Sequence, residues 1–194
     1  MLRALFHKIR SWRVFDDAGG SEIIELAVSL PLLIVFAVGI YDFSAAFILK
    51  QKITHITEEA ARVAVNQPTS DLSSLSLCPP SICAIRNVVD QALANAGVND
   101  CGLSGATPTK AALTWTFTAS NGNCSGLILI INRGVIYGAA LPSPFQPGYT
   151  IEATSVTLKY PYQWQFGKAI SLIAPGASYA SGPIQSVATM QNLN

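Results

Sequence analysis

The sequence contains few charged side chains and only two histidines. Asp, Glu, Lys and Arg make up 12% of the 194 residues, about half of their share in an ordinary soluble domain. The formal net charge is +1 at pH 7, which gives no electrostatic support for binding to nucleic acid. The two histidines are far apart and neither lies near the cysteines, so we expect no metal site.

The sequence also lacks the motifs of common enzymatic reactions. It has no glycine-rich phosphate loop, no nucleophile elbow and no paired histidines. Carboxylates are scarce after residue 65, and none has a convincing partner in the sequence: Asp71, Asp90, Asp100 and Glu152. We therefore expect no enzyme and no cofactor, and a membrane-tethered enzyme is the least favoured function.

The sequence does have one long apolar run. Residues 23–49 are interrupted by charge only at Glu25 and Asp42. At about 1.5 Å rise per residue, a helix of this length crosses the roughly 30 Å hydrocarbon core of a bilayer. Beyond residue 49 the apolar residues recur at helical spacing through Ile53, Ile56 and Ala60. One continuous helix is predicted, with its first half in lipid and an amphipathic second half in water, ending before Pro68.

A basic segment precedes the apolar run. Residues 1–13 carry four cations and no acid, which predicts that the N-terminus stays in the cytoplasm. A lipid-binding or partner-binding helix is the alternative role for these cations. Residues 16–20 are turn-forming, and we expect them to break the helix. The apolar run is too long for a cleaved secretory signal, and its small residues come before it rather than after it.

The segment from Gly20 to Arg62 resembles a known family. Ser21 follows Gly20, Glu25 is the fifth residue after Gly20, and residues 30–33 read Leu-Pro-Leu-Leu. Gly39-Ile40, the acidic-aromatic pair Asp42-Phe43 and the closing Glu-Ala-Ala-Arg of residues 59–62 complete the pattern. Together these features resemble the TadE-like minor pilins, or pseudopilins, of the tight-adherence (Flp) pilus. The family usually has Glu where this chain has Asp42, and beyond residue 65 the likeness is looser.

The resemblance implies cleavage after Gly20 by a prepilin peptidase, which leaves Ser21 with a free amine. It also implies that Glu25 pairs with that ammonium group, on its own or on a neighbouring subunit, during pilus assembly. A carboxylate in an apolar helix is costly unless it is paired, although Glu25 can instead remain hydrated at the interface. The implied partners are the prepilin peptidase, other pilins, the Tad secretion machinery and membrane lipid.

Three further residues of the helix are candidates for packing or interface roles. Pro31 removes a helix hydrogen bond and predicts a kink, and Gly39 belongs to the resemblance. Asp42 lies near the outer end of the apolar run, beside the aromatic residues Tyr41 and Phe43. Two explanations of Asp42 stay open: a hydrated carboxylate at the lipid boundary, or an ion pair with a basic residue of a neighbour.

All four cysteines follow the helix and are candidates for disulfides: Cys78, Cys83, Cys101 and Cys124. Disulfides imply an oxidising compartment for this part of the chain. Four cysteines allow three pairings, of which we expect Cys78–Cys83 with Cys101–Cys124. Four residues separate the first two thiols, unlike the two residues of a redox motif, so zinc binding and thiol chemistry are less favoured.

The remaining chain predicts an α+β domain. We expect a helix over residues 82–96, capped by Ser81 and ended by Gly97. Strands are expected over residues 113–118, 127–131, 135–137, 149–160 and 178–190, with a turn at Arg133-Gly134 and a short helix or loop over residues 162–173. An antiparallel sheet would then pack on the upper half of the long helix. Four aromatic residues are expected in its core: Trp115, Phe117, Tyr160 and Trp164.

The expected organisation is a leader of residues 1–20, a TadE-like helix of residues 21–66 that spans the membrane over about residues 23–49, and an extracytoplasmic domain of residues 67–194. The expected function is that of a minor pilin or pilus-assembly subunit in the bacterial inner membrane, with a cytoplasmic N-terminus and later incorporation into the pilus. The alternative is an uncleaved, single-pass envelope protein with a C-terminal binding domain.

Overall fold

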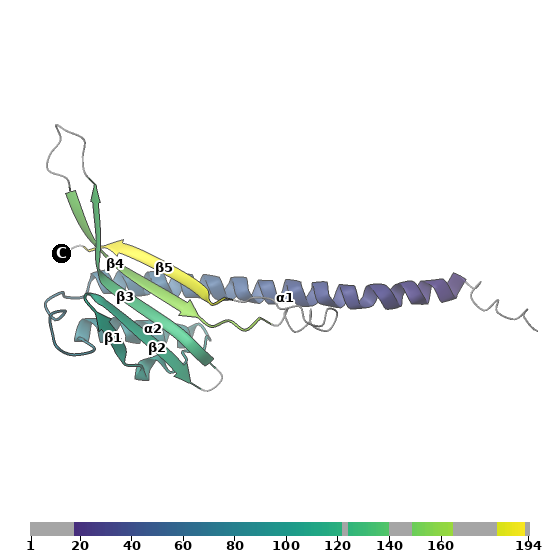
Figure 1. Cartoon of the computed structure of the whole chain (residues 1–194), viewed down its shortest axis with the longest axis horizontal. Coiled ribbons are helices and arrows are strands. Elements are labelled where there is room, and N and C mark those ends of the chain that lie inside the picture. The colour runs from purple at the N-terminus through teal and green to yellow at the C-terminus, as the bar shows by residue number, and fades with distance from the viewer. Residues whose placement is uncertain (1–17, 122–123, 140–148, 165–181, 193–194) are drawn as a thin grey trace, which may run out of the picture. The chain divides into compact units, whose positions relative to one another are not determined.

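Helix α1 (Ala18–Val65) is the first element of the described structure (Figure 1). The computed structural model describes residues 18–121, 124–139, 149–164 and 182–192. The chain divides into two compact units, Met1–Ser44 with Trp164–Ala180 and Ala45–Gln163 with Ser181–Asn194. The boundary falls within α1, which contributes its N-terminal part to the first unit and its C-terminal part to the second.

The continuous helix expected from the apolar run is confirmed, but the break expected over residues 16–20 does not include residues 18–20, which are helical. α1 is 48 residues long and includes Gly19 and Gly20. Each glycine disfavours a helix by roughly 1 kcal/mol relative to alanine. Extending an existing helix is much easier than nucleating one, so the strong helix that follows carries both glycines. Residues 16 and 17, where the break was also expected, lie outside the described residues.

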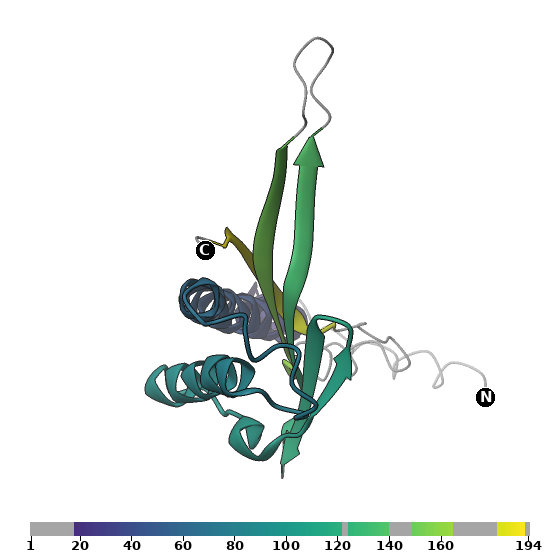
Figure 2. The same ribbon diagram turned by 90° about the vertical axis from the view of Figure 1, so that its left-hand side faces the viewer.

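The C-terminal part of α1 is amphipathic, as its sequence predicts. Ile53, Ile56 and Ala60 are buried, whereas His55 and Arg62 are exposed. The buried side belongs to one hydrophobic core that includes residues of α2 (Pro80–Asn95) and of the sheet. Figure 2 shows this part of α1 and α2 side by side on one face of the sheet.

Helix α2 forms where it was expected, but Ser81 is not its N-cap. Pro79 occupies the cap position and makes no side-chain hydrogen bond. The carboxylate of Asp71 instead accepts bonds of 2.8 Å from both the backbone N–H and the hydroxyl of Ser81. This carboxylate therefore satisfies a free N–H of the first turn from outside the helix.

The expected end of α2 at Gly97 is confirmed. Gly97 has a φ of +66°, and the N–H of Val98 donates to the carbonyl of Leu93 at 2.9 Å, as in a Schellman motif. α2 has no basic residue in its last turn. Lys52 of α1 supplies the missing cation, because its Nζ donates to the carbonyl of Ala96 at 2.7 Å.

In the described part of the chain, five antiparallel strands follow α2 and a short 3-10 helix, η1 (Leu103–Gly105), in the spatial order β1-β2-β3-β4-β5. The strands are β1 (Pro108–Ala111), β2 (Thr114–Asn121), β3 (Cys124–Ala139), β4 (Tyr149–Tyr160) and β5 (Ile184–Gln191). The antiparallel sheet is confirmed, β4 has the bounds that the sequence predicts, and β1 was missed. The last strand is shorter than expected, and the expected residues 165–173 and 178–181 lie outside the described residues.

The core face of the sheet follows the alternation expected from the sequence. Trp115 of β2 lies opposite Ile131 of β3, which lies opposite Val156 of β4, and all three are fully buried. A second buried row contains Phe117 and Leu129. These rows face the two helices, so the second unit is a sheet covered on one side by helices. Trp164, which was expected in this core, is not part of it.

The expected turn at Arg133-Gly134 is also wrong, because β3 continues through both residues. The register shifts between Asn132 and Val135, which marks a β-bulge. The N–H of Arg133 donates to the carbonyl of Leu113 at 2.8 Å. A Cβ on Gly134 would lie 3.0 Å from the Cβ of Leu113, so a larger residue here would have to displace Leu113, and the glycine avoids that contact.

The bulge directs Arg133 to the C-terminal end of α1. Arg133 is 5% exposed, and its guanidinium donates to the carbonyls of Ala64 at 2.7 Å and Gln67 at 3.0 Å. Burial lowers the pKa of Arg133, while the negative charge of Asp71 raises it. A buried cation from the sheet therefore donates to the last turn of α1, where the carbonyl of Ala64 also accepts the N–H of Gln67 at 3.2 Å, and to the turn that follows it.

We predict that Arg133→Met destabilises the second unit. The substitution leaves two carbonyls at the end of α1 without these donors, and the expected loss is about 2–4 kcal/mol in the free energy of unfolding. Thermal unfolding of the full chain in detergent, followed by near-ultraviolet circular dichroism, measures it. Arg62→Met is the matched control, since Arg62 is an exposed arginine in the last turn of the same helix. Equal losses in the two variants would contradict this role of Arg133.

Candidate functional site

The candidate site is the exposed apolar part of α1. The helical segment Glu22–Val65 contains an 18-residue window with a mean hydropathy of 2.5, and 6% of that window is buried. Ile23 is 70% exposed, Phe36 60% and Phe47 63%. A core helix of similar hydropathy would be mostly buried within its own fold. By length and composition, this helix is able to cross a bilayer and fits a membrane anchor.

The residues of the expected processing site lie at the start of α1. The backbones of Gly20 and Ser21 are helical, and the side chain of Glu25 is exposed. Residues four apart share a helix face, with Cβ atoms about 5–6 Å apart. The carboxylate of Glu25 is therefore on the same face as Ser21, where a new N-terminal ammonium group would be produced.

The expected packing residues are in two different environments. Pro31 is inside α1 and exposed. Gly39 is buried, and Asp42 is only 1% exposed. These two residues share a face with Ala46 by helical spacing, and Ala46 is also buried. The burial of Asp42 differs from a hydrated carboxylate at the lipid boundary, which was one of the two explanations left open by the sequence.

The cysteines form two disulfides in the second unit. Cys78 is bonded to Cys83, and Cys101 to Cys124, which is the pairing expected from the sequence. The first disulfide joins the loop after α1 to the first turns of α2. The second joins the segment before η1 to the start of β3. Both constrain the second unit, and they imply an oxidising compartment for it.

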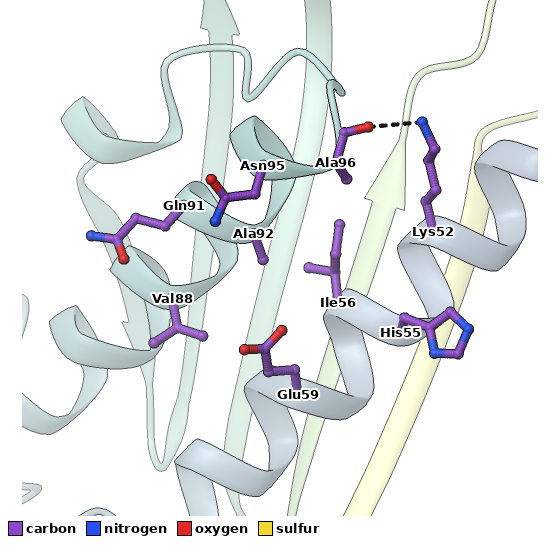
Figure 3. A pocket seen from close by; sticks show the side chains of 9 residues that line it. All are labelled: Lys52, His55, Ile56, Glu59, Val88, Gln91, Ala92, Asn95 and Ala96. Atoms are coloured by element: carbon purple, nitrogen blue, oxygen red, sulfur yellow. Dashed lines mark hydrogen bonds between the residues drawn. The ribbon is translucent and has the colours of Figure 1, made fainter.

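A groove of about 440 Å³ lies between α1 and α2 in the second unit (Figure 3). Figure 3 shows Lys52 of α1 pointing to the carbonyl of Ala96 and Glu59 pointing toward α2, whereas the ring of His55 lies on the side of α1 away from α2. The polar side chains that line the groove are of several types and include one histidine, His55, and one carboxylate, Glu59. Within the described ranges, no group of three or more His, Cys, Asp or Glu could hold a metal ion.

The structure brings together two carboxylates that the sequence left without partners. The side chain of Asp90 in α2 is hydrogen-bonded to that of Asp100. Burial raises the pKa of Asp90 from its ordinary value of 3.8, and the hydrogen bond and charge of Asp100 raise it further. The N–H of Ser104 and the charge of Arg86 act in the opposite direction.

The comparisons with known proteins locate the family likeness in the same part of the chain. The model of the family described as TadE-like protein matches residues 20–62. The match covers the start of α1, its exposed apolar part and most of its amphipathic part. It confirms the family resemblance of this segment and supports a protein related to the tight-adherence pilus. No curated protein and no solved structure matches the chain.

We predict a measurable pH dependence from the carboxylate pair. A carboxyl group with a raised pKa in the folded protein binds its proton more tightly than the unfolded chain does. Its contribution to stability is therefore present below its ordinary pKa of 3.8 and is lost as the pH rises through the raised value. Asp100→Asn removes the like charge, so the variant should lose less stability than the wild type between acidic and neutral pH.

Thermal unfolding midpoints of the full chain in detergent, measured across this pH range, provide the test. Glu152→Gln is the control, because Glu152 is an exposed carboxylate of the same unit. Equal slopes for the wild type and Asp100→Asn would show that Asp100 does not raise the pKa of Asp90.

Proposed function

From the TadE-like segment at residues 20–62, we propose that this chain is a minor pilin or pseudopilin of a tight-adherence pilus. In this proposal a prepilin peptidase cuts after Gly20, and the mature chain enters the pilus through α1. The main support for the proposal is the exposed apolar part of α1, because 6% of its most apolar 18-residue window is buried within the described structure. Such a surface requires lipid before assembly and the helices of other pilins afterwards.

The charged groups at the N-terminus support this proposal, in which the chain lies in the membrane before it is cleaved and enters the pilus. Residues 1–13 are basic and hold the N-terminus in the cytoplasm, so that the second unit with its two disulfides lies outside the inner membrane. Removal of residues 1–20 replaces this leader with the ammonium group of Ser21. An intramembrane carboxylate such as Glu25 is stabilised by pairing with that cation, on its own helix or on a neighbouring one.

The alternative function is an uncleaved, single-pass envelope protein whose second unit binds a partner. One observation favours it, since the bond between Gly20 and Ser21 lies inside a helix. The first turn of a helix opens easily, however, and two glycines weaken it further. Cleavage thus needs only local fraying of α1.

The first test of the proposal is the N-terminus of the mature protein. In cells with the prepilin peptidase, N-terminal sequencing and intact mass should identify Ser21 as the first residue. In matched cells without the peptidase, the chain should begin at Met1. A chain that keeps Met1 in both strains would contradict cleavage and support the permanent anchor.

The second test separates Glu25 from a neighbouring carboxylate. Glu25→Ala should lower incorporation into sheared pili by roughly tenfold or more, because it removes the partner of the new ammonium group inside an apolar environment. Glu22→Ala is the matched control: Glu22 is also an exposed carboxylate at the start of α1, and it should leave incorporation near the wild-type level. Quantitative blotting of the pilus and membrane fractions gives the ratio. Equal incorporation of the two variants would remove the proposed role of Glu25.

A further inference from the structure

Three aromatic side chains lie at one level of the first unit. Tyr41 and Phe43 of α1 are 74% and 50% exposed. The ring of Trp164, from a distant part of the sequence, packs edge-on against Phe43, with 5.4 Å between the ring centroids and an interplanar angle of 63°. All three residues belong to the first compact unit.

This level coincides with the end of an apolar span of bilayer length. The 20 residue steps from Ile23 to Phe43 correspond to about 30 Å of helix, which equals the thickness of the hydrocarbon core. The first cations after this span are Lys50 and Lys52, more than one helical turn beyond Phe43. When Ile23 lies at one boundary of the hydrocarbon core, Phe43 lies at the other.

The side chain of Trp164 is distinct from the other tryptophan that the structure describes. Trp115 is fully buried in the core of the second unit, whereas Trp164 is outside that core and packs on the membrane-anchor helix. Trp164 is partly exposed, but its indole N–H is buried, so the exposed part of its ring is apolar. The exposed phenol ring of Tyr41 is apolar with one hydroxyl at its end. Both ring types therefore favour the boundary between hydrocarbon and water.

We propose that Tyr41, Phe43 and Trp164 form an aromatic anchor that binds the lipid–water boundary of the bilayer and fixes the depth of α1. Its ligand is the headgroup and upper acyl region of the lipid. The anchor connects the chain after β4 to the membrane surface through Trp164, in addition to the connection through α1 itself. This inference rests on the membrane location proposed above.

Depth-dependent quenching of tryptophan fluorescence tests the proposal. The full chain is reconstituted at a low protein-to-lipid ratio into phosphatidylcholine vesicles with bromine either near the glycerol end or near the methyl end of the acyl chains. Trp12→Phe serves as the background, and the difference between Trp12→Phe and Trp12→Phe/Trp164→Phe isolates the emission of Trp164. This design leaves Trp115 in place, so the core of the second unit is unchanged.

Bromine near the glycerol end should quench Trp164 more strongly than bromine near the methyl end, by roughly twofold or more. Stronger quenching by the deep bromine would overturn the proposal, as would no quenching by either lipid. In the second case, access of aqueous iodide would place Trp164 in water, and its exclusion would show that protein covers the ring.

Leu33→Trp in the Trp12→Phe/Trp164→Phe background tests the membrane location separately. Leu33 is 59% exposed and lies halfway between Ile23 and Phe43, so the deep bromine should quench it most. If Leu33→Trp is quenched in this way while Trp164 is not, the helix spans the bilayer and the aromatic anchor is wrong. If neither is quenched, the membrane location itself is wrong, and the anchor with it.

Discussion

The structure depends on the removal of apolar side chains of α1 from water. Within the described residues, 6% of the most apolar 18-residue window of α1 is buried. Hydrophobic burial contributes about 25 cal/mol per Å² of apolar surface, so a helix of this length with exposed Ile, Leu and Phe side chains is strongly driven out of water. A lipid bilayer is one environment that removes such a helix from water, and the length and composition of α1 fit a membrane anchor.

The second half of α1 has a different role, because it is part of a folded unit. Its buried side belongs to the same core as α2 and the sheet. In addition, a basic side chain donates hydrogen bonds at the C-terminal end of each of the two helices. Arg133 of β3 donates to carbonyls at the end of α1, and Lys52 of α1 donates to the end of α2. Asp71 holds the first turn of α2 and is close enough to Arg133 to affect its pKa. The loop between the helices is thus fixed by charge as well as by the disulfide Cys78–Cys83.

The parts of the fold that local patterns encode could be predicted from the sequence. The apolar run and its helical continuation identify α1, and alternation identifies β2 and β4. The errors fall where distant residues decide the local structure. Arg133-Gly134 has the composition of a turn, but packing against Leu113 makes it a bulge within β3. Ser81 is a residue type that commonly caps helices, but here the carboxylate of Asp71 accepts the free N–H in the first turn of α2.

The same distinction between local sequence patterns and contacts of distant residues applies to the candidate site. Gly20, Ser21 and Glu25 are identified by spacing along one helix, whereas the contact of Trp164 with Phe43 and the pair Asp90–Asp100 depend on tertiary structure. No period in the sequence connects Trp164 to α1, so a core position in the sheet was the reasonable expectation for an aromatic residue near β4.

The central claim is that the first half of α1 is removed from water by a membrane. The most direct measurement is the distribution of the full chain between membrane pellet and supernatant after an alkaline wash, in cells that lack the pilus assembly machinery. Because no pilus can form there, lipid is the remaining environment for the apolar helix, and the chain should stay in the pellet until detergent is added. Recovery of an intact, monomeric chain in the supernatant would contradict the account.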